Sequence, residues 1–128
     1  VACASPDRPI SKEQLPATAQ QFLQEYFADV EVTLAHEDGP VVRREYDVTL
    51  ADGTHIEFSA DGRWREVESR GALPQGIVPP SITTYVAKHY AAYSIVRIER
   101  SRREWEVDLS NGLEITFDRR FRVISIDD

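Results

Sequence analysis

Side chains that can act as acids, bases or cation ligands recur at alternating positions in two similar stretches of the chain. The first stretch, YDVTLADGTHIEF, begins at Tyr46, and the second, WEVDLSNGLEITF, begins at Trp105. Paired carboxylates can transfer protons or bind Ca²⁺. The alternating polar positions are therefore the first candidates for chemistry: Asp47, Thr49, His55, Glu57, Glu106, Asp108, Glu114 and Thr116.

The solvated face of an antiparallel sheet carries the same kind of residue, because only its other face packs on a core. The sequence contains no D-x-[DN]-x-[DN]-G calcium loop, no HExxH and no CxxC. Its three histidines, His36, His55 and His89, do not have zinc-ligand spacing. We therefore expect no catalytic residues, no metal and no cofactor, and we expect the chain not to be an enzyme.

Composition limits the partners. The chain has 128 residues, a formal net charge of −7 and 41% hydrophobic residues, which is enough for one folded domain. An acidic protein is a poor ligand for phosphate backbones, so nucleic acid is excluded as a partner. No apolar run approaches the roughly 18 residues of a membrane span. We expect an unidentified protein or peptide partner with basic character.

The amino-terminal residues VACASPDRPI are typical of an exported leader or signal remnant over residues 1–10. Ala2-Cys3-Ala4 has the small-x-small pattern of a signal peptidase site, which implies a periplasmic or secreted protein. Val1-Ala2-Cys3 also fits the end of a lipobox. In that alternative the protein is anchored to the outer membrane through a lipid on Cys3.

Two helices are expected at an interval of 63 residues. Apolar residues after Leu15-Pro16 follow the i, i+3, i+4, i+7 spacing of one helix face. A proline suits the first turn of a helix, where its missing N–H costs little. Adding 63 to each position gives a similar stripe after Val78-Pro79. The two stripes are Ala19, Phe22, Leu23, Tyr26, Phe27 and Ile82, Tyr85, Val86, His89, Tyr90.

The two quoted stretches predict hairpins with three-residue loops. The loops are expected at residues 51–53 and 110–112, each ending in a left-handed glycine, Gly53 or Gly112. This loop length places every large apolar residue of the hairpin on one face of the sheet. The predicted opposite pairs are Tyr46 with Phe58, Val48 with Ile56, Trp105 with Phe117 and Val107 with Ile115. A further turn should set Trp64 opposite Phe58 and Phe121 opposite Phe117. Strand parity points Val67, Ile124 and Ile126 away from the core.

The expected fold class is α+β, built from tandem α-β-β-β-β repeats. The repeats should form a continuous antiparallel sheet of up to eight strands, with both helices on one face. The first repeat covers residues 11–70 and the second covers residues 71–128, in one compact domain. A segment rich in glycine and proline, residues 69–80, links them.

The chain resembles the bacterial PepSY-like, β-lactamase-inhibitor-like family. The resemblance covers about residues 10–128. It rests on a Leu-Pro pair, a helix ending in Tyr-Phe, and the stretches YDVTLADGTHIEF, ADGRW and WEVDLSNGLEITFD. It implies tandem α+β repeats, export to the periplasm or beyond, and no known enzymatic activity. The inhibitor label implies a concave sheet face that grips a partner enzyme. The chain departs from the pattern at Arg120, where a turn-forming residue is commoner.

The sheet face opposite the helices is the candidate binding site. It should carry the eight alternating polar residues, with Arg65 and Arg122 at its margin. We expect a non-enzymatic module that binds a protein or peptide there, with inhibition of an enzyme as one form of this activity. The alternative is binding of a small ligand or a cation to the same acidic face.

Overall fold

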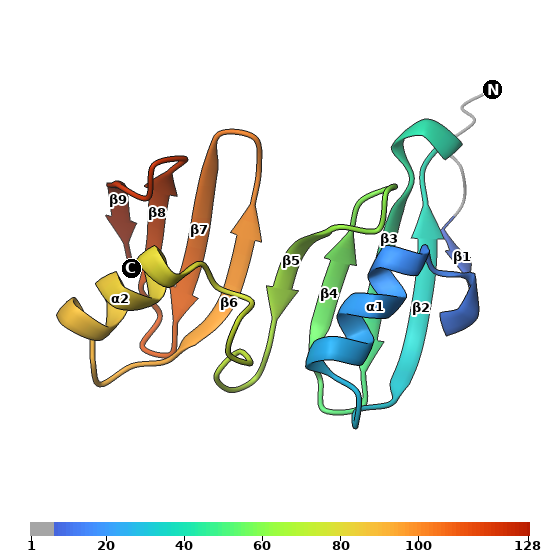
Figure 1. Ribbon diagram of the computed structural model, residues 1–128, viewed down its shortest axis with the longest axis horizontal. Coiled ribbons are helices and arrows are strands. Elements are labelled where there is room, and N and C mark those ends of the chain that lie inside the picture. The colour runs from blue at the N-terminus through green and yellow to red at the C-terminus, as the bar shows by residue number, and fades with distance from the viewer. Residues whose placement is uncertain (1–6) are drawn as a thin grey trace. The chain divides into compact units, whose positions relative to one another are not determined.

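The computed structural model describes residues 7–128, which form two α-helices and nine strands (Figure 1). The chain divides into two compact units, residues 1–65 and residues 66–128. The strands pair in chain order, from β1 to β9, in one antiparallel sheet. The expected α+β class is therefore confirmed. The export signals proposed around Cys3 lie outside the described residues.

The first unit contains β1 (Arg8–Pro9), α1 (Ala17–Tyr26), β2 (Val32–Asp38), β3 (Glu45–Leu50) and β4 (His55–Phe58). Short 3₁₀ turns lie at Lys12–Gln14 and Val41–Arg43. Helix α1 begins after Pro16 and lies across its strands (Figure 1). Its buried Ala19 and Leu23 belong to a core that also contains Phe27, Ala35, Val48, Leu50, Ile56 and Phe58.

The second unit contains α2 (Pro80–His89), β6 (Ile95–Arg100), β7 (Glu104–Leu109), β8 (Glu114–Asp118) and β9 (Val123–Asp127). Strand β5 (Trp64–Glu68) begins in the first unit and pairs with β6 through its last three residues. Helix α2 starts one residue after Pro79, as α1 starts after Pro16. The core of the second unit contains Ile82, Val86, Ile98, Trp105, Val107, Leu109, Ile115 and Phe117.

Both hairpins have the predicted register. Val48 stands opposite Ile56, and Val107 stands opposite Ile115. Gly53 and Gly112 both have φ of +90°. The amides of these glycines donate to the carbonyls of Leu50 and Leu109, which closes each loop. Three-residue loops are therefore confirmed, and they leave the alternating polar side chains on the face away from the core.

The prediction for the second turn after β8 was wrong. Val123, and not Phe121, stands opposite Phe117. Phe121 occupies the left-handed position of the turn, with φ of +63°, where the first unit has Gly62 at +84°. Its ring lies 5.8 Å from that of Trp105, so packing holds a bulky residue in a conformation that glycine would adopt without strain.

Two further expectations need correction. Residues 8 and 9 of the expected leader form β1, which pairs with β2 and adds a ninth strand. Val67 is fully buried, because β5 places it opposite the core residue Ile98. Ile124 and Ile126 are exposed, but Ile126 stands opposite buried Ile115 on the helix side of the sheet. Its exposure follows from its position on the last strand.

Candidate functional site

The open face of the first unit brings together the polar residues predicted for it. Asp47 stands opposite Glu57 and Thr49 stands opposite His55, and all four are half-buried. The His55 Nε2 atom lies 3.4 Å from Asp47 Oδ1. Burial raises the pKa of Asp47, and His55 partly opposes this while the charge of Glu45 adds to it. This carboxylate therefore has a cationic partner at hand when His55 is protonated.

Arg65 lies on the same face of the first unit, as predicted. Its Nη1 atom is 3.0 Å from Glu45 Oε1 and 3.8 Å from Glu57 Oε1. Glu45, at the start of β3, was not among the candidates. The open face of the first unit therefore mixes three carboxylates with one guanidinium and an imidazole.

The second unit gathers carboxylates more densely. Glu106 stands opposite Thr116 and Asp108 stands opposite Glu114 on adjacent strands. Carboxylate oxygens of Glu106, Asp108 and Glu114 all lie within 4.8 Å of one another, and the three side chains are half-buried. Thr116 is buried beside them, with 8% exposure. These three carboxylates are called the carboxylate trio.

Arg97 on β6 is the main functional residue that sequence reasoning missed. Its guanidinium forms ion pairs with Glu66, with Glu99 and Glu106 at 3.4 Å, and with Asp108 at 3.5 Å. Only 14% of its side chain is exposed. Burial alone would lower the pKa of Arg97, but the hydrogen bond and charge of Glu66, with Asp108 and Glu99, raise it. Arg97 therefore stays charged.

The carboxylates around Arg97 resist ionisation. Burial raises the pKa of Glu106, and a hydrogen bond and charge repulsion from Glu114 raise it further. Burial also raises the pKa of Asp108, to which the negative charges of Glu106 and Glu68 add. Arg97 acts in the opposite direction on both groups. Repulsion between carboxylates therefore persists at this site despite the presence of Arg97.

Strand pairing extends this surface beyond the trio. Glu66 stands opposite Glu99, Glu68 stands opposite Arg97, and Asp127 stands opposite Glu114. These positions share the face that turns away from α2. We call this surface the acidic face, and it consists of Glu66, Glu68, Arg97, Glu99, Glu106, Asp108, Glu114 and Asp127.

Arg122 lies at the end of the strands and not beside the trio. Its Nε atom donates to Asp118 Oδ2 at 2.7 Å, and its backbone amide donates to Asp118 Oδ1. These bonds and the amide of Arg120 lower the pKa of Asp118. Arg122 therefore stabilises its own turn, and its side chain remains 69% exposed.

Comparison with known proteins identifies the family. A family model described as "putative beta-lactamase-inhibitor-like, PepSY-like" matches residues 44–125. The chain belongs to this family. The matched segment includes both hairpins and the whole carboxylate trio. No curated protein matches the chain.

Solved structures of similar proteins come from Bacteroides. One, from Bacteroides vulgatus ATCC 8482, is described as a "putative periplasmic protein" of the DUF2874 family. It is 41% identical, with a TM-score of 0.93 over 98% of this chain and 99% of the other. Another, from Bacteroides thetaiotaomicron, is described as a "putative calcium-regulated periplasmic protein". It is 36% identical, with a TM-score of 0.91 over 95% and 97%.

A further structure from Bacteroides vulgatus ATCC 8482, described as a "putative periplasmic protein of unknown function", is 29% identical. Its TM-score is 0.90 over 96% of this chain and 100% of the other. All three descriptions place these proteins in the periplasm. Within residues 7–128, neither helix has the length and apolar character needed to cross a membrane.

Proposed function

We propose that this chain is an exported, non-enzymatic binding module whose acidic face binds a basic surface of a protein or peptide. The observation that carries the proposal is the charge of that face, which holds seven carboxylates and one guanidinium. Such a surface attracts a positively charged partner and discriminates against acidic ones. The family description supports an inhibitor-like role, in which the bound partner is an enzyme.

Export is part of the proposal. The periplasmic descriptions of three similar structures support it, together with the small-x-small pattern around Cys3. The two expected processing routes give different products. Cleavage after Ala4 removes Cys3, whereas lipid modification of Cys3 retains the protein on a membrane. Mass spectrometry of protein expressed with its own signal and fractionated from the cell envelope distinguishes the two.

The test neutralises two carboxylates of the acidic face without adding cations. Glu106→Gln with Glu114→Gln is preferred to lysine, because a lysine would lie beside Arg97 and disturb folding. The raised pKa of Glu106 means that the folded state already disfavours its charge, so glutamine should leave stability nearly unchanged. The control removes two exposed carboxylates of the first unit, through Glu13→Gln with Asp29→Asn.

Wild type, variant and control are each coupled to a resin and exposed to one periplasmic extract. A partner of the acidic face should be retained by wild type and control and lost by the variant. The dissociation constant of the complex with the wild type should also rise about tenfold or more between low and moderate salt, because both surfaces are charged. A partner that binds the variant as tightly as the wild type would refute the assignment of this face.

A second candidate function is binding of Ca²⁺ by the carboxylate trio. Two observations favour it: the oxygens of the trio lie within 4.8 Å of one another, and one similar protein is described as calcium-regulated. Carboxylate oxygens are the ligands that Ca²⁺ prefers, although Arg97 competes for them. Millimolar CaCl₂ should then raise the melting temperature of the wild type. Glu114→Gln should abolish that rise, and an equal rise in both proteins would exclude the trio.

A further inference from the structure

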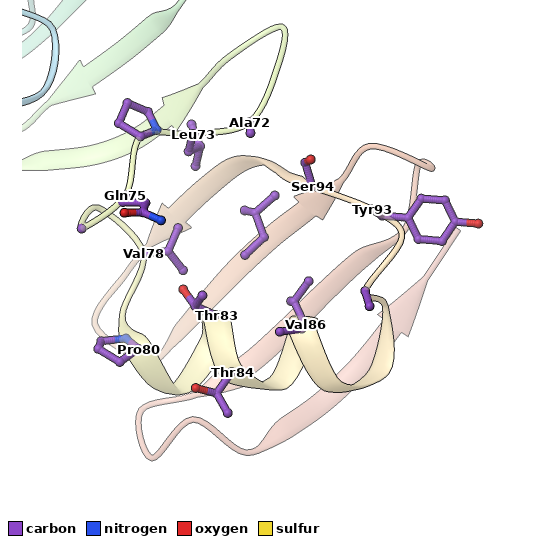
Figure 2. Close-up of a pocket in the computed structure, with 15 residues that line it drawn as sticks. Ala72, Leu73, Gln75, Val78, Pro80, Thr83, Thr84, Val86, Tyr93 and Ser94 are labelled. Carbon is purple, nitrogen blue, oxygen red and sulfur yellow. The ribbon is translucent and has the colours of Figure 1, made fainter.

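The second unit contains an open pocket that the proposed function does not use. Its volume is about 530 Å³, and it lies between the linker after β5, helix α2 and the segment leading into β6 (Figure 2). Pockets of roughly 300–1,000 Å³ are the size at which proteins bind small organic ligands. None of its lining residues belongs to the carboxylate trio or to the rest of the acidic face.

The walls of the pocket are uncharged. None of the fifteen residues that line it is an Asp, Glu, Lys or Arg, although 29% of the chain is charged. The lining residues include apolar Leu73, Val78, Val86 and Ile95 and uncharged polar residues such as Thr83. Figure 2 shows the side chains of Thr83 and Val86 on the helix and of Val78 on the linker. An ionic ligand would lose its hydration here without gaining a counter-charge.

The linker wall of the pocket is held in place. The amide of Ser69 donates to the carbonyl of Val96 at 2.8 Å, and the amide of Leu73 donates to the carbonyl of Ile95 at 3.0 Å. At the other end, Ile77 is buried with 5% exposure, and Gly76 makes a left-handed turn at φ of +99°. The space is therefore bounded by an anchored segment and is preformed, as small-molecule pockets usually are.

The first unit provides an internal reference for the helix side of this pocket. Its own pocket, of about 580 Å³ between residues 9–12 and 28–35, includes charged Lys12, Asp29 and Glu31 and no residue of α1. Seven residues (10–16) join β1 to α1, whereas eleven residues (69–79) join β5 to α2. The fourth residue of α1 is Gln20, whose side-chain amide donates to the carbonyls of Glu13 and Leu15 at 3.2 and 2.8 Å. The fourth residue of α2 is Thr83, which is too short to do so. The longer linker and the smaller side chain together leave the pocket of the second unit open to α2, whose Thr83 and Val86 line it.

We propose that this pocket binds a neutral small molecule with an apolar body and a hydrogen-bonding group. The apolar body would lie against Leu73, Val86 and Ile95, and the polar group would face the hydroxyl of Thr83. The uncharged lining determines the ligand class, because a buried apolar surface favours uncharged ligands and penalises ionic ones.

N-phenyl-1-naphthylamine, a neutral and apolar dye, tests the proposal by its fluorescence on binding. The wild type should give a saturable increase. Thr83→Gln introduces into α2 the residue that stands at the corresponding position of α1, and it should weaken binding at least tenfold. Ser81→Gln is the matched control, because Ser81 is exposed on the same helix but does not line the pocket. Far-ultraviolet circular dichroism checks that all three proteins are folded.

Two further measurements complete the test. Ala91→Trp fills the pocket from the segment that follows α2 and should also weaken dye binding. The anion 1-anilinonaphthalene-8-sulfonate is the same dye with one added sulfonate, and it should bind at least tenfold more weakly than the neutral dye. The proposal is overturned if the wild type gives no saturable signal, if both filling variants bind normally, or if the two dyes bind equally well.

Discussion

Removing the charge of Arg97 should destabilise the second unit, and the loss should depend on pH. In Arg97→Met an apolar chain of similar length replaces the guanidinium, and the carboxylates of Glu66, Glu99, Glu106 and Asp108 lose their shared partner. Breaking a fully buried ion pair costs about 3–5 kcal/mol, and an exposed pair contributes about 0.2–1 kcal/mol. Here the partners are 21–44% exposed, so solvent screens them in part. We expect a loss of about 2 kcal/mol at pH 7.

The pH dependence follows from the carboxylate pKa values. Burial raises the pKa of Glu106 and of Asp108 above their ordinary values, while Arg97 lowers both. Without Arg97 the folded-state pKa values rise further. A carboxyl whose folded pKa exceeds its unfolded value stabilises the fold below the unfolded pKa, and this contribution is lost as pH rises through the folded pKa. The stability difference between wild type and Arg97→Met should therefore shrink as pH falls from 7 toward the ordinary carboxyl range.

Urea unfolding at pH 7 and at about pH 4.5, followed by circular dichroism, measures both effects. Arg97→Lys is the informative control, because it retains the charge but lacks the planar fork that contacts several carboxylates at once. It should lose less stability than Arg97→Met at pH 7. A loss below about 0.5 kcal/mol at pH 7, or an equal loss at both pH values, would refute a shared, partly buried charge centre.

Three other predictions concern the fold. In Gly112→Ala the added methyl meets no atom within 4 Å, so the only loss of stability, about 1 kcal/mol, comes from the left-handed alanine. In Gly62→Ala the methyl would lie 2.9 Å from Pro16 Cβ, and the loss of stability should be about 3 kcal/mol. Comparable losses in the two variants, measured by urea unfolding, would disprove this close approach to α1. Phe117→Ala removes a fully buried ring that packs edge-on against Tyr85 and should cost about 3–5 kcal/mol by the same measurement. Phe121→Gly should relieve the strained turn but lose the ring contact with Trp105, so its net change in stability should stay below about 1.5 kcal/mol in either direction.

Hairpin register could be read from the sequence because two stretches impose the same alternation independently. Val48 and Ile56, like Val107 and Ile115, reach one face only if each loop has three residues, and Gly53 or Gly112 allows that loop. A one-residue slip would expose the whole apolar set. The polar face of each hairpin follows directly from this register, so the sequence alone places the trio among the candidate residues.

Arg97 escaped prediction because strand alternation is interrupted just before it. The pairing of β6 with β7 shifts between Ile95 and Arg97, so counting alternate positions from the start of the strand assigns the wrong face. Val67 was misassigned in a similar way, because its face depends on pairing with β6 across a long linker. Phe121 was misplaced because a bulky residue with positive φ is uncommon, and only its contact with Trp105 explains it.

A comparison of the two hairpins within this chain bears on the recognition surface proposed above. Their core pairs are nearly identical: Val48 and Ile56 in one match Val107 and Ile115 in the other. On the open face, however, Thr49 is matched by Asp108 and His55 is matched by Glu114. A merely solvated face requires no such concentration of carboxylates. Burial raises the pKa of Glu106 and Asp108, and the negative charge of neighbouring carboxylates adds to it. The second unit therefore carries an electrostatic cost that folding does not require, and a cationic partner would relieve that cost on binding.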